Sequence, residues 1–244
     1  MKIDFVIPVY NEEQLLEKNI LKLLNFLKLQ KYNFYWQIKI VINGSNDNSA
    51  DIAQKISQKE EKIKCLIIKE KGKGKAIREA IEKSLADYVI YMDIDLAVSL
   101  ENINDLILEI KNDYDLIIGS RLLPLSQRER SWIKDLSSKT YIFLSKIILN
   151  HNFSDLQCGF KAIRRSCFNK IVDLIEDNGW FFDTEVLIFF QKNKFKIKEI
   201  AVNWSENRYE KRKSKIKLFK DSILFISNLI KLKKRFYKKN KNNI

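Results

Sequence analysis

Strand and helix patterns alternate along the first half of the chain. Short apolar runs rich in β-branched and aromatic residues are typical of buried strands, and they occur at residues 3–9, 36–42, 65–68, 89–92 and 115–119. Apolar residues at helical spacing lie between them, at residues 15–27, 49–60, 75–85 and 100–111. This alternation predicts an α/β fold with a mostly parallel central sheet and helices on both faces.

The order of elements changes after Arg121. Residues 122–130 form a polar stretch that predicts a loop. The patterns that follow predict a helix at 131–149, a strand at 159–163, helices at 166–177 and 183–192, and a strand at 197–204. No repeat and no Gly/Ser-rich linker divides the chain. We therefore expect one α/β domain over residues 1–205 and a basic helical tail over residues 206–244.

The tail is predicted to be an amphipathic helix with many lysines. Its apolar residues at helical spacing are Ile216, Phe219, Ile223, Ile226 and Ile230. Such a helix can lie on an anionic membrane, or it can pack its apolar stripe on the domain. The sequence favours packing for the stripe, and attraction to membrane or phosphate for residues 233–241.

The net positive charge of the chain indicates the kind of partner that it binds. The 244 residues carry a net charge of +14, which implies an anionic partner such as a nucleic acid, a lipid surface or a phosphorylated substrate. The N-terminus lacks the pattern of a signal peptide, and no uncharged apolar run approaches the ~20 residues that span a bilayer. We expect a soluble or peripheral protein.

The cysteine and histidine content argues against disulfides and against catalytic or metal sites built on several histidines. Three cysteines without close-pair spacing argue against a disulfide framework and favour a reducing, cytoplasmic compartment. His151 is the only histidine, so a catalytic triad or a metal site built on several histidines is not expected.

Two carboxylates follow the fourth predicted strand. Asp93 and Asp95 sit one residue apart, at the carboxyl end where open α/β sheets hold ligands. If the backbone stays extended, their side chains share one side. Paired carboxylates suit a divalent cation and, through it, a diphosphate. Alone this pattern is weak, because aspartates at strand ends also cap helices and turns.

Other strand ends carry charge as well. Tyr10 and Glu12 follow the first strand, Lys73 lies in a Gly-Lys-Gly-Lys segment before a helix, and Arg121 ends the fifth strand. Free N–H groups and lysines at a helix start attract phosphate. Helix capping and a basic turn are the alternative interpretations, but the meeting of these ends at one edge favours a binding crevice.

In these segments the chain resembles the inverting family 2 glycosyltransferases of GT-A fold. Within that family it is similar to the dolichyl-phosphate glucosyltransferases and dolichol-phosphate mannose synthases, with the glucosyl branch closer. The most specific matches are Asp-Leu-Gln-Cys-Gly-Phe-Lys at 155–161 and Trp-Phe-Phe-Asp-Thr-Glu at 180–185. The others lie at 6–13, 72–76, 93–95, 119–121, 130–131 and 199–204.

The resemblance implies a role for each matching position. The nucleotide-sugar site would contain Pro8, Tyr10, Glu12, Asn43, Lys73, Asp93 and Gln157. Asp93 and Asp95 would bind the diphosphate through Mg²⁺ or Mn²⁺. Arg121, Arg130 and Ser131 would receive the phosphate of a polyprenyl lipid. The catalytic residues would be Asp95, Asp155 and Glu185.

One departure from the family pattern concerns the base. The family usually carries Asp-Asp-Gly-Ser after its second strand, and here Asn43 replaces a carboxylate. Guanine presents a paired N–H edge that favours a carboxylate, whereas the N3–H of uracil needs one acceptor that an amide supplies. We therefore expect a UDP-sugar rather than a GDP-sugar.

The expected activity is transfer of a hexose, glucose before mannose, to a polyprenyl phosphate with inversion. A lipid phosphate is already anionic, so it needs no strong base. If the acceptor were instead a sugar or protein hydroxyl, Asp155 would be the base. A nucleic-acid binder is the remote alternative, but it gives no reason for carboxylates at a strand end, so no nucleic-acid partner is expected. The enzyme would work at the cytosolic face of a membrane.

Overall fold

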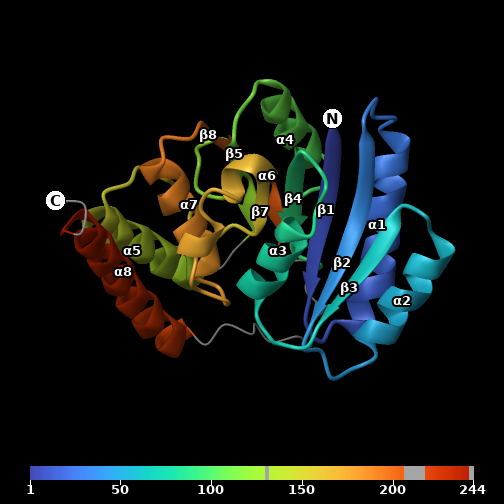
Figure 1. The fold of residues 1–244 in the computed structure, drawn as a ribbon, viewed down its shortest axis with the longest axis horizontal. Helices are drawn as coiled ribbons and strands as arrows, with labels where there is room; N and C mark the ends of the chain where they lie inside the picture. Colours follow the sequence, from blue (N-terminus) through green and yellow to red (C-terminus); the bar gives the residue numbers. More distant parts are fainter. Residues whose placement is uncertain (130–131, 206–217, 242–244) are drawn as a thin grey trace.

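The computed structural model describes residues 1–129, 132–205 and 218–241. Its centre is a seven-stranded sheet of order β3-β2-β1-β4-β7-β5-β8 (Figure 1). All neighbours in this sheet are parallel except β7, which runs antiparallel between β4 and β5. The predicted α/β fold with a mostly parallel sheet is confirmed. The strands are β1 (Lys2–Val9), β2 (Tyr35–Asn43), β3 (Ile63–Ile68), β4 (Tyr88–Met92), β5 (Leu116–Ser120), β7 (Phe160–Arg164) and β8 (Ile197–Ala201).

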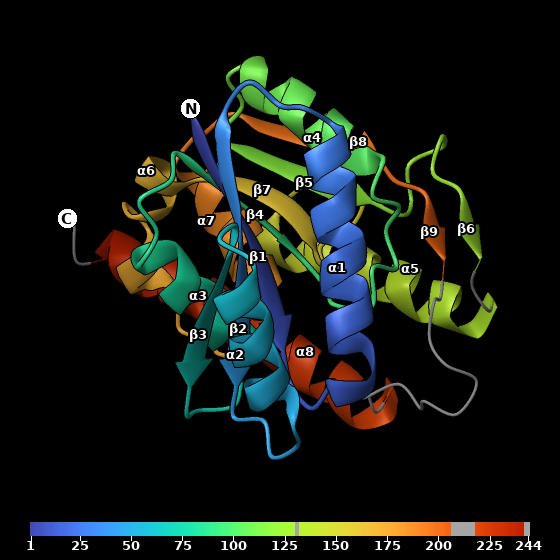
Figure 2. The same ribbon diagram turned by 90° about the vertical axis from the view of Figure 1, so that its right-hand side faces the viewer.

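Helices cover both faces of the sheet, as Figures 1 and 2 show. One face carries α1 (Glu13–Leu29), α2 (Ser49–Lys59) and α4 (Asn102–Lys111), and the other carries α3 (Lys73–Glu82), α5 (Trp132–Leu149), α6 (Arg165–Phe168), α7 (Phe182–Lys192) and α8 (Leu218–Lys241). Alternate strand residues enter opposite cores: Phe5 and Ile90 face the first set of helices, whereas Val6 and Tyr91 face the second.

The structure differs from the prediction at the predicted strand 197–204 and at the predicted loop 122–130. The predicted strand at 197–204 is interrupted, because its last residue belongs to β9 (Trp204–Ser205). That strand pairs in parallel with β6 (Arg128–Glu129), inside the segment predicted to be a loop. The two short strands form a second sheet beside the first.

The predicted helix at 166–177 is wrong as a continuous element. The chain forms only α6 and a 3₁₀ turn, η1 (Val172–Leu174), and it is extended at Ile175. The N–H groups of Glu176 and Asp177 are bound by the carboxylate of Glu185, at 2.9 and 2.8 Å. A tertiary acceptor therefore replaces the intrahelical one, which sequence periodicity does not reveal.

The C-terminal helix packs on the domain. α8 lies beside α5 (Figure 1), and Leu229 and Leu232 are buried in the same core as α3 and α7. Ile226 and Ile230, predicted to lie on the packed stripe, are instead 36% and 45% exposed. The packed face is thus rotated from the predicted one, and the side chains at 216, 219 and 223 lie outside the described part of the chain.

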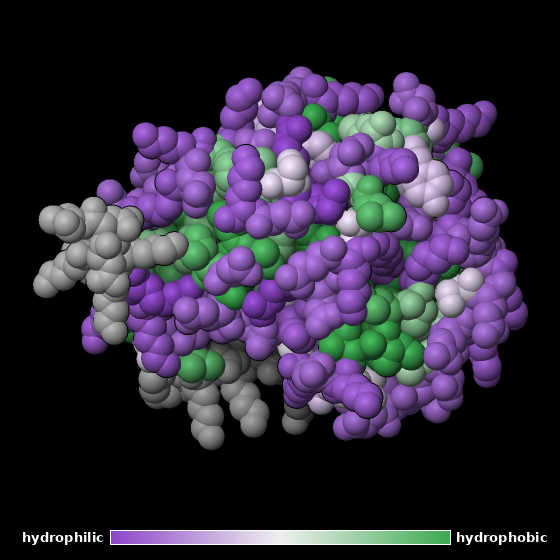
Figure 3. Space-filling view, viewed as in Figure 1, coloured by the Kyte–Doolittle hydropathy of each residue, from purple (hydrophilic) through white to green (hydrophobic). Residues whose placement is uncertain are grey.

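The surface seen in Figure 3 is mostly hydrophilic, with separate hydrophobic groups between charged side chains. In the described residues, no helix has both the length and the apolar content that crossing a bilayer requires.

Truncating a packed residue of α8 tests this arrangement. We expect Leu232→Ala to lower the free energy of unfolding by about 2–5 kcal/mol, because it leaves a cavity in the core. Ile226→Ala, on the exposed side of the same helix, should change it by less than about 1 kcal/mol. Urea unfolding followed by circular dichroism measures both, and equal effects would contradict the packing of α8.

Candidate active site

The strand order places the candidate site at one edge of the sheet. β2 and β3 lie on one side of β1, and β4 lies on its other side. Ligands of open α/β sheets bind outside the carboxyl ends of strands at such a switch point. Tyr10 follows β1, Asn43 ends β2, and Asp93 and Asp95 follow β4. The topology therefore brings together the strand ends that the sequence singled out.

The two aspartates after β4 lie in a turn. The N–H of Leu96 donates to the carbonyl of Asp93 at 3.1 Å, and Leu96 has a φ of 48°. The backbone is therefore not extended here, and the condition for two aligned strand side chains is not met. Ile94 and Leu96 are nevertheless buried, while Asp93 and Asp95 are half-exposed, so both carboxylates remain on the accessible side.

Lys73 and Asp93 form the central ion pair of the site. Lys73, the first residue of α3, places its Nζ 2.6 Å from Asp93 Oδ1 and 4.0 Å from Asp183 Oδ2. Burial opposes a charged Lys73, but the two aspartates outweigh it and raise its pKa. A Cβ at position 159 would overlap the ends of both side chains, so the pair in its present position lies directly against Gly159.

A second lysine completes a buried row of charges. Lys161 on β7 is fully buried and donates to Asp183 and to the carbonyl of Cys158. The Tyr91 hydroxyl also donates to Asp183, at 2.6 Å. Burial acts to raise the pKa of Asp183, but the lysines outweigh it and lower the pKa. Asp183 thus stays ionised between two ammonium groups.

The first turn of α3 does not present the free N–H groups that the sequence predicted. The N–H of Gly74 donates to the carbonyl of Gly179, and that of Lys75 donates to the carbonyl of Asn178, each at 3.1 Å. These amides are therefore already bound, and the expectation of free N–H groups for phosphate is wrong at both. The Lys73 side chain, not the helix terminus, carries the positive charge into the site.

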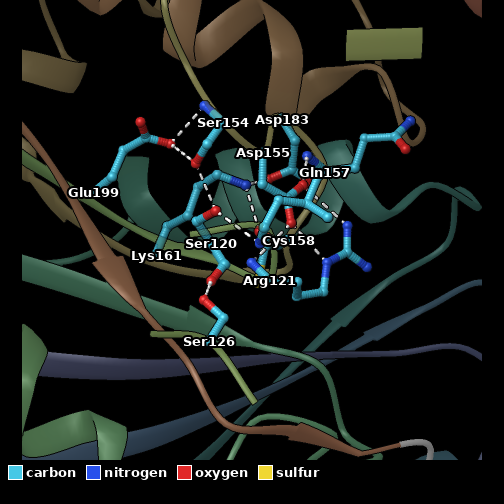
Figure 4. Close-up of polar contacts among 11 residues, drawn as sticks. Ser120, Arg121, Ser126, Ser154, Asp155, Gln157, Cys158, Lys161, Asp183 and Glu199 are labelled. Carbon is cyan, nitrogen blue, oxygen red and sulfur yellow. Dashed lines mark hydrogen bonds and ion pairs between the residues drawn. The ribbon is translucent and has the colours of Figure 1, made fainter. Parts of the chain in front are cut away.

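Arg121 and Asp155 are paired with each other (Figure 4). Asp155 Oδ2 accepts from Arg121 Nε at 2.7 Å, and Oδ1 accepts from Nη2 at 3.0 Å. Burial acts to raise the pKa of Asp155, but Arg121 outweighs it and holds the pKa at about 2. Such a carboxylate is a poor general base near neutral pH. Asp155 is instead suited to orienting the guanidinium.

A hydroxyl relay, not expected from the sequence, supports this pair (Figure 4). The hydroxyls of Ser120 and Ser154 lie 2.6 Å apart, and Ser154 donates through both its N–H and its hydroxyl to Glu199. Ser120 precedes Arg121 and Ser154 precedes Asp155, so the relay fixes both backbones. Gln157 extends away from this group, and its N–H donates to Asp155.

Glu185 performs a different task from the predicted one. Its side chain is 2% exposed, and its carboxylate binds the N–H groups of Glu176 and Asp177 and the guanidinium of Arg235 on α8. These contacts join a loop to the C-terminal helix and do not support a place at the reaction centre. Burial raises the pKa of this carboxyl.

The nucleoside side of the crevice lies at the ends of β1 and β2. Pro8 is buried in β1, Glu12 is 8% exposed, and the ammonium of Lys71 lies 4.1 Å from the ring centre of Tyr10. Asn43, the last residue of β2, is only 3% exposed.

Two residues predicted to receive the acceptor phosphate, Arg130 and Ser131, lie outside the described residues.

His151 has a structural role. It is 3% exposed and hydrogen-bonded to Ser145 and to the N–H of Phe153. Burial lowers its pKa to about 4, so it remains neutral at physiological pH.

Comparison with known proteins defines the family. The model of "Glycosyl transferase family 2" matches residues 4–172. The chain belongs to this family. The dolichyl-phosphate beta-glucosyltransferase of Saccharomyces cerevisiae is 31% identical over 92% of the chain and 72% of that protein. The glycosyltransferase AglD of Haloferax volcanii is 28% identical over 95% of the chain, which spans only 37% of AglD.

Solved structures support the same fold for this family 2 glycosyltransferase. Glucosyl-3-phosphoglycerate synthase from Mycobacterium tuberculosis, in complex with Mn²⁺, UDP and glucosyl-3-phosphoglycerate, matches with a TM-score of 0.70. The match covers 95% of the chain and 79% of that structure at 13% identity. At this identity the likeness concerns the fold alone, and it is consistent with the predicted GT-A architecture.

The carboxylates of this family 2 chain can be tested as metal ligands. No cluster of three or more His, Cys, Asp or Glu side chains suited to a metal occurs among the residues that the structure describes. Mg²⁺, however, is commonly held by one or two carboxylates together with water and substrate phosphates. Asp93 and Asp95 satisfy that requirement in donor type and exposure.

Replacing Asp155 by a neutral residue tests how much its ion pair with Arg121 contributes to the free energy of unfolding. We expect Asp155→Asn to lower the free energy of unfolding by about 3–5 kcal/mol, because a buried guanidinium loses its counter-charge. Asp173→Asn, at an exposed position, is the control.

The difference should also depend on pH. The folded-state pKa lies below the usual value of 3.8, so the stabilisation is present above that value and is lost as pH falls toward about 2. Denaturant titrations at several pH values measure it, and a difference that grows on acidification would contradict the ion pair.

Proposed function

We propose that this family 2 chain transfers a hexose, glucose before mannose, from a UDP-sugar to a polyprenyl phosphate with inversion. The observation that carries the proposal is the pairing of Lys73 with Asp93 beside Asp95 at the switch point of the sheet. Similarity to dolichyl-phosphate beta-glucosyltransferases, at 31% identity to the yeast enzyme, supports the sugar and the lipid acceptor.

The nucleoside would bind at the ends of β1 and β2. The amide of Asn43, in a side chain that is 3% exposed, would supply the single acceptor that uracil N3–H needs. Pro8, Tyr10 and Glu12 would line the same pocket. The structural neighbours that hold UDP agree with this choice of base.

The diphosphate would lie between Lys73 and the two aspartates. Asp93 and Asp95 would hold Mg²⁺ or Mn²⁺, which supplies charge stabilisation to the departing diphosphate. Lys73 remains cationic through Asp183, so it can donate to the diphosphate when Asp93 turns to the donor or cation. Gln157, in the loop above Asp155, would border the sugar.

The acceptor would enter on the side of Arg121, with Arg130 and Ser131. Asp155 fixes the plane of the Arg121 guanidinium, and a fixed guanidinium is suited to orienting a phosphate. A phosphate oxygen attacks without a strong base. The low pKa of Asp155 and the buried, neutral His151 therefore favour a phosphate acceptor over a hydroxyl acceptor.

The helix α8 would bring the enzyme to the cytosolic face of a membrane. Ile226 and Ile230 are exposed on it, and the exposed Lys231 and Lys234 lie on the same helix. Exposed apolar residues among lysines suit a surface of anionic lipids. We propose peripheral contact through this helix.

Removing Asp95 should abolish metal-dependent transfer. We expect Asp95→Asn to lower kcat by about two orders of magnitude or more, because the cation loses a ligand. Initial rates of hexose transfer against Mn²⁺ concentration measure this, with Asp51→Asn on the exposed side of α2 as control. Unchanged Mn²⁺-dependent rates in the Asp95 variant would refute the metal site.

The nucleotide base that the donor site prefers can be identified from the stabilisation that each nucleotide gives the folded protein. UDP with Mn²⁺ should raise the melting temperature more than GDP does, since a ligand that binds only the folded state stabilises it. Asn43→Ala should remove most of the UDP effect, while Asn112→Ala, at the exposed C-cap of α4, should keep it. An equal or larger shift with GDP would contradict the assignment of uridine.

A further inference from the structure

We propose that Arg235 and Glu185 are positioning residues for Lys73. In this proposal the C-terminal helix holds the loop of residues 174–180, and that loop holds the first turn of α3. The inference rests on the proposed function, because it treats Lys73 as the ligand of the donor diphosphate. It makes α8 part of the donor site, although α8 is distant from it in sequence.

The first link joins α8 to the loop. The guanidinium of Arg235 contacts three acceptors: Glu176 Oε1 at 3.1 Å, the carboxylate of Glu185, and the carbonyl of Leu174. The second oxygen of Glu185 binds the N–H groups of Glu176 and Asp177. Because Glu185 is 2% exposed, its carboxylate depends on these protein partners rather than on water.

The second link joins the loop to α3. Carbonyls of Gly179 and Asn178 bind the N–H groups of Gly74 and Lys75, and Arg78 on α3 donates to the carbonyl of Ile175 at 2.7 Å. The approach is so close that a Cβ at position 72 would overlap the Asn178 carbonyl, and Gly72 has a φ of 152°. The loop thus contacts the chain on both sides of Lys73, by close approach at Gly72 and by hydrogen bonds at Gly74 and Lys75.

The third link concerns the side chain of Lys73. Its ammonium lies 5.0 Å from the ring centre of Trp180, which belongs to the same loop, and 2.6 Å from Asp93. The backbone and one wall of the Lys73 site therefore come from the segment that Arg235 holds. A displacement of about 1 Å in a catalytic group can cost about 10²-fold in rate.

Two variants weaken the first and the second link. Arg235→Met removes the guanidinium but keeps an apolar side chain beside Phe189, over whose ring the guanidinium lies. Arg78→Met cuts the link between the loop and α3. Lys111→Met changes an exposed lysine on α4, on the opposite face of the sheet, and serves as the control.

The experiment compares kinetics and UDP-glucose binding across these variants. We expect Arg235→Met and Arg78→Met to raise the KM for UDP-glucose about tenfold or more, with the KM for the lipid phosphate unchanged. Arg235→Lys should recover part of the loss. A merely structural role would lower the amount of active enzyme without this split between the two KM values.

A double-mutant cycle with Lys73→Ala decides whether the effect passes through Lys73. In that background Arg235→Met should add little, because coupled residues are not additive. Full additivity, or a wild-type KM for UDP-glucose in folded Arg235→Met, would overturn the inference. If the wild-type chain binds no nucleotide sugar by calorimetry and transfers none, the proposed function fails instead.

Discussion

A buried row of alternating charges is the interaction on which the candidate site depends. Lys161, Asp183, Lys73 and Asp93 follow one another from the interior to the half-exposed end of β4. They come from β7, α7, α3 and the turn after β4, so the row joins elements that are far apart in sequence. Removing Lys161 or Asp183, the two fully buried members, would leave an uncompensated charge in a low-dielectric interior, which costs about 3–5 kcal/mol.

The same principle explains the chemistry that the site can perform. Its cations are already paired with carboxylates: Lys73 with Asp93, and Arg121 with Asp155. Charged groups held in place before a ligand arrives stabilise developing charge without reorganisation. Neither Asp155, with a pKa of about 2, nor His151, buried and neutral, is suited to act as a general base. An acceptor that is already anionic fits such a site.

Most of the sheet and the meeting of its charged strand ends could be predicted, because both follow from local patterns. Runs of buried residues define the strands, and the carboxyl ends of parallel strands meet. The contacts of individual side chains could not be predicted, because they depend on the tertiary structure. Glu185 binds the N–H groups of a loop, and Leu229 rather than Ile230 packs inward. The buried row had one signal, since Lys161 and Asp183 interrupt apolar runs, and charges buried in such runs are normally paired.

The most direct test of the account is the product formed from UDP-glucose and polyprenyl phosphate. The purified chain would be incubated with both and Mn²⁺ in detergent, and the lipid analysed by mass spectrometry and by NMR of the anomeric proton. The account predicts one hexose on the lipid phosphate in β linkage, from the α-linked donor. An α-linked product, or transfer only to a hydroxyl acceptor by folded protein, would contradict it.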